Sequence, residues 1–203
     1  MKAFNGYDQA KEAARQTGSG AKLPPGAYKA KIIGVKYEQG KNGTSDRILI
    51  QFDITEGEFK DFFRTQYDEN TSEDKKWKGR TNIFIPKDDG SEKDSYTKKA
   101  FAGWTSSFEK SNNGYVWDWD ETKWVDKLVG IVFGETGTVI EGKEVVYTEP
   151  RFAVEVEKVR DGKAPEAKFK AKNGYKGTSA SSAPISDTEF MTVSAGVREE
   201  LPF

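Results

Sequence analysis

One short segment of the sequence combines positive charge with an aromatic ring. Residues 75–80 read Lys-Lys-Trp-Lys-Gly-Arg, so the Trp77 indole stands among four cations. Proteins that hold single-stranded nucleic acid without reading its sequence use cations along the phosphates and flat rings on which bases stack. Because lysine is rarely buried completely, we expect the ring between these lysines to be exposed to a ligand.

Further residues of the same kind lie on the strands that we predict. Arg64 and Tyr67 fall on a predicted third strand, and cations occupy the polar faces of the first two strands, Lys36 among them. A charged strand face is often merely solvated, and this alternative stays open. The candidate contacts to single-stranded DNA are Lys29, Lys31, Arg47, Arg64, Tyr67, Lys75, Lys76, Trp77, Lys78 and Arg80.

The end of the sequence has the composition of a tethered ligand for another protein. Residues 161–186 hold five lysines against two acids and no apolar pattern, which predicts a disordered basic linker. Residues 187–203 are acidic and end in apolar residues. The candidate partner-binding residues are Glu199, Glu200, Leu201, Pro202 and Phe203.

Two residue types that are common in active sites are missing from the sequence. It has no Cys and no His, which removes thiol nucleophiles, imidazole bases and the usual zinc ligands. No phosphate-binding loop is present. Carboxylates at residues 88–92 and 118–121 fit solvated turns or helix N-termini better than a metal pair, although a carboxylate-metal nuclease is a distant alternative. We expect no enzyme, no metal and no cofactor.

Composition places limits on the environment of the chain. It has 203 residues, of which 35% are hydrophobic and 32% are charged, and its formal net charge is −1. A basic binding face must therefore be balanced by acids elsewhere. The absence of cysteine, of an apolar leader and of a run of about 20 apolar residues predicts a soluble, cytoplasmic protein with no membrane partner.

The elements that must position these residues form one domain over residues 23–160. Period-two alternation predicts strands from residue 27 and over 47–54, and a third strand over 59–67, while 81–85 fits a short extra strand or an extended connection. Three- and four-residue spacing predicts a helix over 91–111. Later strands are expected at 128–133, 145–147 and 152–159. Residues 1–22 form an N-terminal extension with a possible short helix at about 9–16.

This order is mostly β with one main helix between strands three and four. It predicts an OB-fold, a five-stranded Greek-key barrel. We expect Tyr28, Phe52, Trp104 and Phe133 in its core. Trp117, Trp119 and Trp124 stand beside acids that would repel phosphate, so we expect them to cover the barrel.

Two parts of the sequence resemble known families. Residues 23–32 (Leu-Pro-Pro-Gly-Ala-Tyr-Lys-Ala-Lys-Ile), the turn at 41–43 and residues 50–59 resemble the opening of single-stranded DNA-binding proteins encoded by phages of Gram-positive bacteria. The resemblance spans roughly residues 23–159. It implies an OB-fold that coats single-stranded DNA during replication or recombination.

The last six residues are similar to the tip of bacterial single-stranded DNA-binding proteins, which end in several aspartates followed by Leu- or Ile-Pro-Phe. There the terminal ring enters a hydrophobic pocket on a replication or repair protein, and its carboxylate meets a basic residue. Leu201, Pro202 and Phe203 match those roles, with two glutamates in place of the acidic run. Arg198 departs from the pattern, which implies weaker electrostatic steering.

Together these features predict a non-enzymatic protein that coats and protects single-stranded DNA without sequence preference. Its tip would recruit replication, recombination or repair proteins in the cytoplasm of a bacterial host, and it could be a homo-oligomer. One alternative is a recombination mediator or annealing accessory. Another is a protein-binding module that mimics the host tip without binding DNA.

Overall fold

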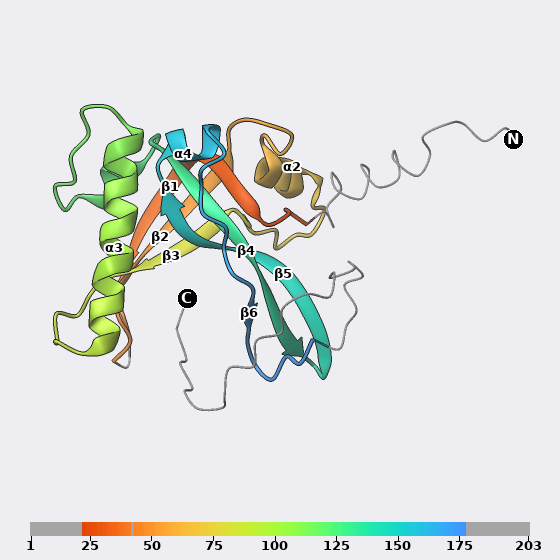
Figure 1. Cartoon of the computed structure of the whole chain (residues 1–203). Coiled ribbons are helices and arrows are strands. Elements are labelled where there is room, and N and C mark those ends of the chain that lie inside the picture. The colour runs from red at the N-terminus through yellow and green to blue at the C-terminus, as the bar shows by residue number, and fades with distance from the viewer. Residues whose placement is uncertain (1–21, 42, 178–203) are drawn as a thin grey trace, which may run out of the picture.

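The structure, a computed structural model, describes residues 22–41 and 43–177. Strands are its main type of secondary structure, with one main helix at the side (Figure 1). Its elements in order are β1 (Gly26–Glu38), β2 (Arg47–Ile54), α2 (Phe62–Glu69), β3 (Arg80–Phe84), α3 (Glu92–Ser111), η1 (Glu121–Trp124), β4 (Leu128–Ile140), β5 (Lys143–Val154), α4 (Val156–Arg160) and β6 (Lys170–Ala171). The prediction of a mostly β chain with one main helix is confirmed.

The strands form one mixed sheet. Its order is β3-β2-β1-β4-β5 with every neighbouring pair antiparallel, and the short β6 pairs with β4 in parallel. This ladder begins at β3 and ends at β5. Within the described residues the sheet is therefore open, where the sequence predicted a five-stranded Greek-key barrel.

The first two strands confirm the period-two alternation. Ala30 and Ile32 of β1 face the core, as do Ile50 and Phe52 of β2. A bulge between Ile32 and Gly34 adds one residue to β1. Even-numbered residues therefore face the core before the bulge and face outward after it.

Aromatic rings fill the interior under the sheet. Phe52 packs edge-on against Phe63 and Phe133, and Tyr28 packs against Phe133 from the end of β1. Burial raises the pKa of the Tyr28 hydroxyl to about 12, and the negative charge of Glu58 adds to this. Phe52, Phe133 and Trp104 lie in the core as expected, and the partly buried Tyr28 packs against it.

The main helix α3 lies where the spacing predicted it. Ser91 caps its start by accepting a hydrogen bond from the backbone N–H of Asp94. At its end, the amide of Asn112 donates to the carbonyl oxygens of Phe108 and Leu128. This second bond ties the helix to the first residue of β4.

The predicted third strand at 59–67 is wrong, because α2 occupies most of it. The carboxylate of Asp53, at the end of β2, accepts hydrogen bonds from the backbone N–H groups of Phe63 and Arg64. A strand residue thus caps the helix from outside, a long-range contact that the local pattern does not show. The real third strand is β3, which was expected only as a short extra strand.

The final strands also differ from the prediction. The hairpin β4–β5 is longer than expected, because both strands run on to the turn at Glu141 and Gly142. β5 is one continuous strand that ends at Val154, and residues 156–160 form the short helix α4 in place of a strand.

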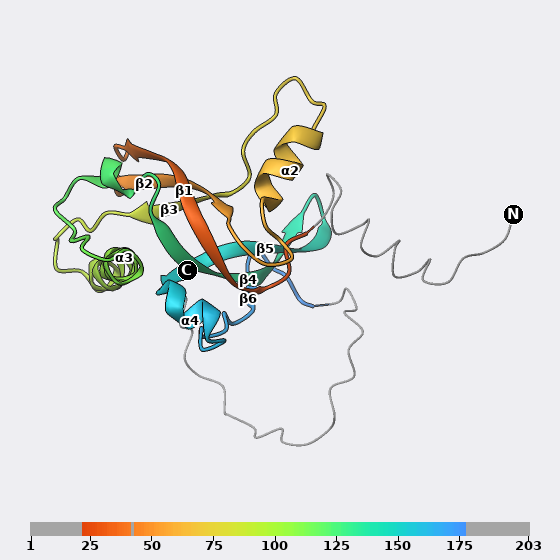
Figure 2. The same ribbon diagram turned by 90° about the horizontal axis from the view of Figure 1, so that it is seen from above.

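Residues 163–177, which we call the strap, run alongside β4, with which Lys170 and Ala171 pair as β6 (Figures 1 and 2). The predicted disordered linker over 161–186 is therefore wrong for this part. Two glycines of β4 leave space for side chains of the strap. A Cβ at Gly134 would stand 2.6 Å from the Ala167 side chain, and one at Gly137 would stand 2.7 Å from the Tyr175 ring. Backbone bonds of β6 hold the strap in place.

The remaining predicted segments fall outside the described residues. These are the extension over 1–21 with its helix at 9–16, residues 178–186 of the linker, and the tail over 187–203. In the part of the chain that the structure describes, none of the helices has the length and apolar character needed to cross a membrane.

Candidate nucleic-acid interface

The outer faces of β1, β2 and β3 form one continuous polar surface. Cross-strand pairing sets its rows: Gly34 with Gln51 and Arg80, Lys36 with Leu49 and Asn82, and Glu38 with Arg47 and Phe84. We call this set the sheet face. Its side chains point away from the core because they alternate with the buried residues Ile48, Ile50 and Ile83.

Phe84 is the aromatic residue of the sheet face. Its side chain is 51% exposed although its strand neighbour Ile83 is almost completely buried. Strand alternation turns this ring outward at the end of β3, because Ile83 and Ile85 face inward. An exposed ring on a charged strand surface is the arrangement on which a base can stack.

Cations flank this ring along the strands. Arg47 lies directly across from Phe84 and donates two hydrogen bonds to Glu38 Oε2, at 2.9 Å from Nε and 2.7 Å from Nη2. Lys36 Nζ lies 3.1 Å from the other oxygen of Glu38. These hydrogen bonds, that of Arg47 first, lower the pKa of the Glu38 carboxyl. Two cations therefore share one carboxylate here.

The opposite end of the sheet face carries Arg80 and Gln51. The side chain of Gln51 lies across Gly34, where a Cβ would stand 2.9 Å from its amide oxygen. The bulge sets Gly34 opposite Gln51. Because Gly34 has no side chain, the surface is flat there, in the same row as the exposed Arg80. Amide and guanidinium groups in this row can bond phosphates or base edges.

Trp77 is placed differently from the prediction. Its indole N–H donates to the carbonyl oxygens of Phe52 (3.1 Å) and Gly79 (3.0 Å), and its half-buried ring packs against the core. The expectation of an exposed ring is wrong. The loop turns the indole inward between exposed lysines, because Gly79 brings the backbone to β2: a Cβ there would lie 2.3 Å from the Phe52 carbonyl oxygen.

The other candidates near Trp77 form a lobe beside the sheet face, seen where α2 projects in Figure 2. The half-buried Tyr67 ring lies 5.8 Å from that of Trp77, and Lys75 Nζ stands 4.5 Å from the Tyr67 ring centroid. Arg64, Lys76 and Lys78 are exposed on the same lobe. Gly79 joins the lobe to β3. The cations of the lobe are therefore close in the chain to Arg80, the first residue of β3.

Lys29 and Lys31 are engaged in ion pairs. Lys29 Nζ lies 2.8 Å from Glu56, and its side chain is only 11% exposed, so it has little surface left for a phosphate. Lys31 pairs at 2.8 Å with Asp126 and stays more exposed. The structure thus brings Arg47 and Arg80 together on one face, but it leaves Lys29 out of that face.

The acidic motifs serve the fold. Asp120 accepts a hydrogen bond from the backbone N–H of Thr122 at the start of η1, and Asp118 pairs with Lys123. At the other motif, Asp88 pairs with Lys98 and Ser91 begins α3. These contacts match the interpretation of turns and helix N-termini. Within residues 22–41 and 43–177, no group of three or more carboxylates could hold a metal ion.

The tryptophan group covers the interior as expected, with one exception. Trp124 is completely buried against Phe108, and Trp117 packs beside it. Trp119, in contrast, is 77% exposed and stacks on Phe101 with ring planes 15° apart.

Sequence reasoning missed Phe84, Asn82 and Leu49 as parts of the site. The signal was present: residues 80–85 alternate, with Thr81, Ile83 and Ile85 inward, and such alternation exposes Phe84 if the segment is a true strand. The partner-binding candidates Glu199, Glu200, Leu201, Pro202 and Phe203 lie outside the described residues.

Comparison with models of known protein families gives no match for the sequence, and comparison with curated proteins gives none either.

Proposed function

We propose that this chain binds single-stranded DNA without sequence preference through the sheet face. One observation carries the proposal: the half-exposed Phe84 ring stands directly across from Arg47 on an open, polar sheet surface. A ring offers stacking to any base, and the cations beside it attract phosphates of any sequence. Each base–aromatic stack contributes about 1–3 kcal/mol, so even one ring matters for affinity.

The strand pairing supports the same proposal. β1 pairs with β2 and β4, β2 pairs with β3, and β4 pairs with β5, while α3 lies between the third and fourth strands. This pairing resembles the plan of an OB-fold that is open between β3 and β5, and the resemblance supports the proposal. The OB-fold is a partly open barrel, and the face of its second and third strands binds oligonucleotides. In this chain that face carries Arg47, Arg80 and Phe84.

The wider role follows the sequence resemblance. We propose a non-enzymatic, phage-encoded protein that coats single-stranded DNA during replication, recombination or repair in the cytoplasm of its bacterial host. The tip over residues 199–203 would dock into partner proteins of the host. The supporting evidence is its composition and its similarity to tips that do so.

Binding of labelled oligodeoxythymidylate to the full chain tests the proposal. Fluorescence anisotropy at several salt concentrations should give an affinity that exceeds that for duplex DNA of equal length. The logarithm of the binding constant should fall linearly with that of the salt concentration, by about 0.7 for each phosphate contacted. The proposal is overturned if no oligonucleotide binds at low salt. Equal affinity for mixed-sequence strands is expected, and a preference above tenfold would contradict the lack of sequence reading.

A further inference from the structure

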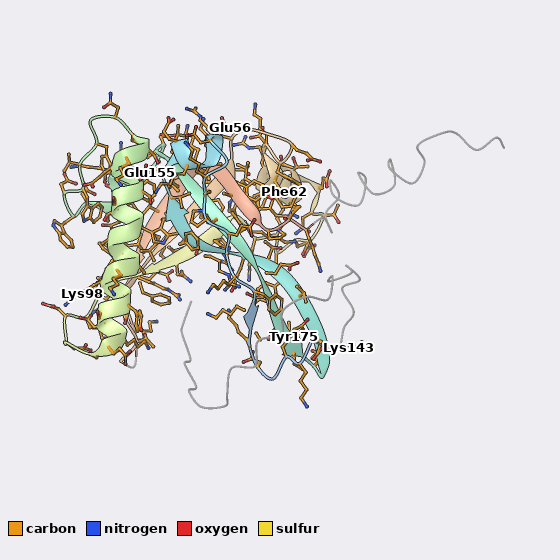
Figure 3. All side chains as sticks on the ribbon, viewed as in Figure 1. Glu56, Phe62, Lys98, Lys143, Glu155 and Tyr175 are labelled. Carbon is orange, nitrogen blue, oxygen red and sulfur yellow. The ribbon has the colours of Figure 1, made fainter. Side chains whose placement is uncertain are left out.

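The strap creates a second charged surface, whose residues are far in sequence from those of the sheet face. It lies along β4 and brings residues of the C-terminal segment beside the hairpin β4–β5 (Figure 1). Figure 3 shows Tyr175 at the outer end of that hairpin. The backbone N–H of Lys172 donates to the carbonyl of Gly137, so the strap is fixed where its charged residues stand.

Two cations contact one carboxylate beside the strap, and a third cation, Lys170, lies nearby. Arg151 Nη1 lies 2.9 Å and Lys172 Nζ lies 3.1 Å from Glu149 Oε1, and Thr136 donates to the same oxygen at 2.8 Å. Lys170 pairs across from Thr136 in β6. We call Arg151, Lys170, Lys172 and Glu149 the strap cluster. Its formal charge is +2, from three cations and one anion.

The four residues of this cluster hold more positive than negative charge. Burial would raise the pKa of Glu149, but hydrogen bonds from Thr136 and Lys172 and the nearby positive charges outweigh this and lower it. The pKa of Lys170 is lowered, first by burial and then by the charges of Lys172 and Arg151. Repulsion of this kind is relieved when a further anion binds.

A ring stands next to the cluster. Phe169 is 50% exposed, and its centroid lies 5.5 Å from that of Tyr175, which packs over Gly137. The strap therefore resembles the sheet face, because an exposed ring lies next to cations that share one carboxylate.

We propose that the strap cluster is a second contact for single-stranded DNA, with a backbone phosphate at Lys170 and Lys172 and a base stacked on Phe169. This inference rests on the proposed function. Arg151 is largely buried, with a side chain 6% exposed, and holds the cluster together through Thr136 and Glu149. The two lysines provide the charge that reaches the ligand.

A double variant with a matched control tests this contact in the full chain. Lys170→Ala/Lys172→Ala removes two charges from the cluster, and Lys163→Ala/Lys176→Ala removes two charges from the ends of the strap. Binding is measured to oligodeoxythymidylates of about 8 and about 30 nucleotides, because one OB domain covers about 4–16 nucleotides. We expect the cluster variant to lose affinity for the long strand only, with a salt slope smaller by about 0.7 for each lost phosphate contact.

The charge-retaining variant Lys170→Arg/Lys172→Arg should bind like the wild type. If the wild type binds both strands and the cluster variant equals the control, this inference fails while the proposed function stands. If the wild type binds neither strand, the proposed function fails. Inorganic phosphate and chloride are also compared at equal ionic strength for their effect on the melting temperature. If phosphate raises it more only when the cluster is intact, and the cluster variant keeps its affinity for the long strand, the cluster is a free-anion site. That result overturns the proposal.

A second measurement does not depend on the stability of the lysine variants. The chain has no cysteine, so Lys168→Cys, next to Phe169, introduces a single thiol for a photo-crosslinking label and keeps the ring proposed to stack. The label should crosslink to the long strand when the sheet face is occupied. A label at Ile140→Cys, which is also exposed at the end of β4, serves as the control. Equal crosslinking from both positions would count against a specific contact at the strap.

Discussion

Arg47 of β2 and Phe84 of β3 are cross-strand partners, so a cation and a half-exposed ring stand side by side on the outer face of the sheet. The same arginine is held by Glu38 through both Nε and Nη2. This arrangement fixes the guanidinium beside the ring without burying either group. It also means that the ring can be removed with little effect on the core.

Replacing Phe84 separates binding from stability. Phe84→Ala should weaken binding of oligodeoxythymidylate by about 1–3 kcal/mol, because one stacking platform is lost. Its melting temperature should stay close to that of the wild type, since the ring is exposed. Anisotropy titration and thermal unfolding measure the two effects. Ile140→Ala, which removes an equally exposed apolar side chain elsewhere, should leave affinity unchanged, and an equal loss there would refute the role of Phe84.

Removing the carboxylate beside Arg47 should strengthen binding. The pKa of Glu38 is lowered by Arg47 and Lys36, so the group is ionised at neutral pH and offsets their charge. Glu38→Gln should therefore tighten binding at low salt and steepen its salt dependence. The control Glu157→Gln makes the same charge change on α4. Weaker binding by the Glu38 variant would mean that the ion pair, by orienting Arg47, matters more than the free charge.

The glycine before β3 should be sensitive to a single methyl group. In Gly79→Ala the added carbon would stand 2.3 Å from the Phe52 carbonyl oxygen and 2.7 Å from the Phe63 ring. We expect a loss of about 1–3 kcal/mol in the free energy of unfolding, measured by urea denaturation. The matched change Gly103→Ala, in open space on α3, should stabilise the protein by about 0.5–1 kcal/mol. Equal effects at the two sites would contradict the packing described.

The strap cluster should show in the pH dependence of stability. The folded-state pKa of Glu149 lies below its ordinary value of 4.5, so its ionised form stabilises the fold above that pH. This contribution is lost as the pH falls through the lowered pKa. Glu149→Gln should therefore be less stable than the wild type at neutral pH, and the difference should shrink below about pH 4.5. Urea denaturation from pH 3 to 7 measures it, with the exposed Glu166→Gln as the control; a gap independent of pH would exclude the charge as the cause.

Local patterns were sufficient for part of the fold. β1, β2 and α3 could be predicted because their apolar residues repeat with the period of the element, and Ser91 and Asn112 mark the ends of α3. The helix α2 could not, since its start is capped by Asp53 from another element. The strap was hidden for a similar reason: its few apolar residues pack on β4 glycines far away in the chain.

The candidate site was predicted in outline but not in detail. Arg47 and Arg80 lie together on the sheet face because strand alternation is a short-range property. The sequence suggested that Trp77 was exposed, because its neighbours are lysines. In a loop, one side chain can point inward while its neighbours point outward. Two hydrogen bonds donated by the Trp77 indole N–H hold its ring inward here. Phe84 was overlooked because its strand was given a minor role.

The glycines of β4 have a consequence for the order in which the protein is made. Gly134 and Gly137 are synthesised before the groups that cover them, because Ala167 and Tyr175 follow more than thirty residues later. During synthesis on the ribosome, the backbone of β4 at these glycines therefore stays uncovered by the strap until the strap has emerged. A nascent chain that stalls after β5 would present that backbone to its surroundings, and the last residues of the strap complete the domain.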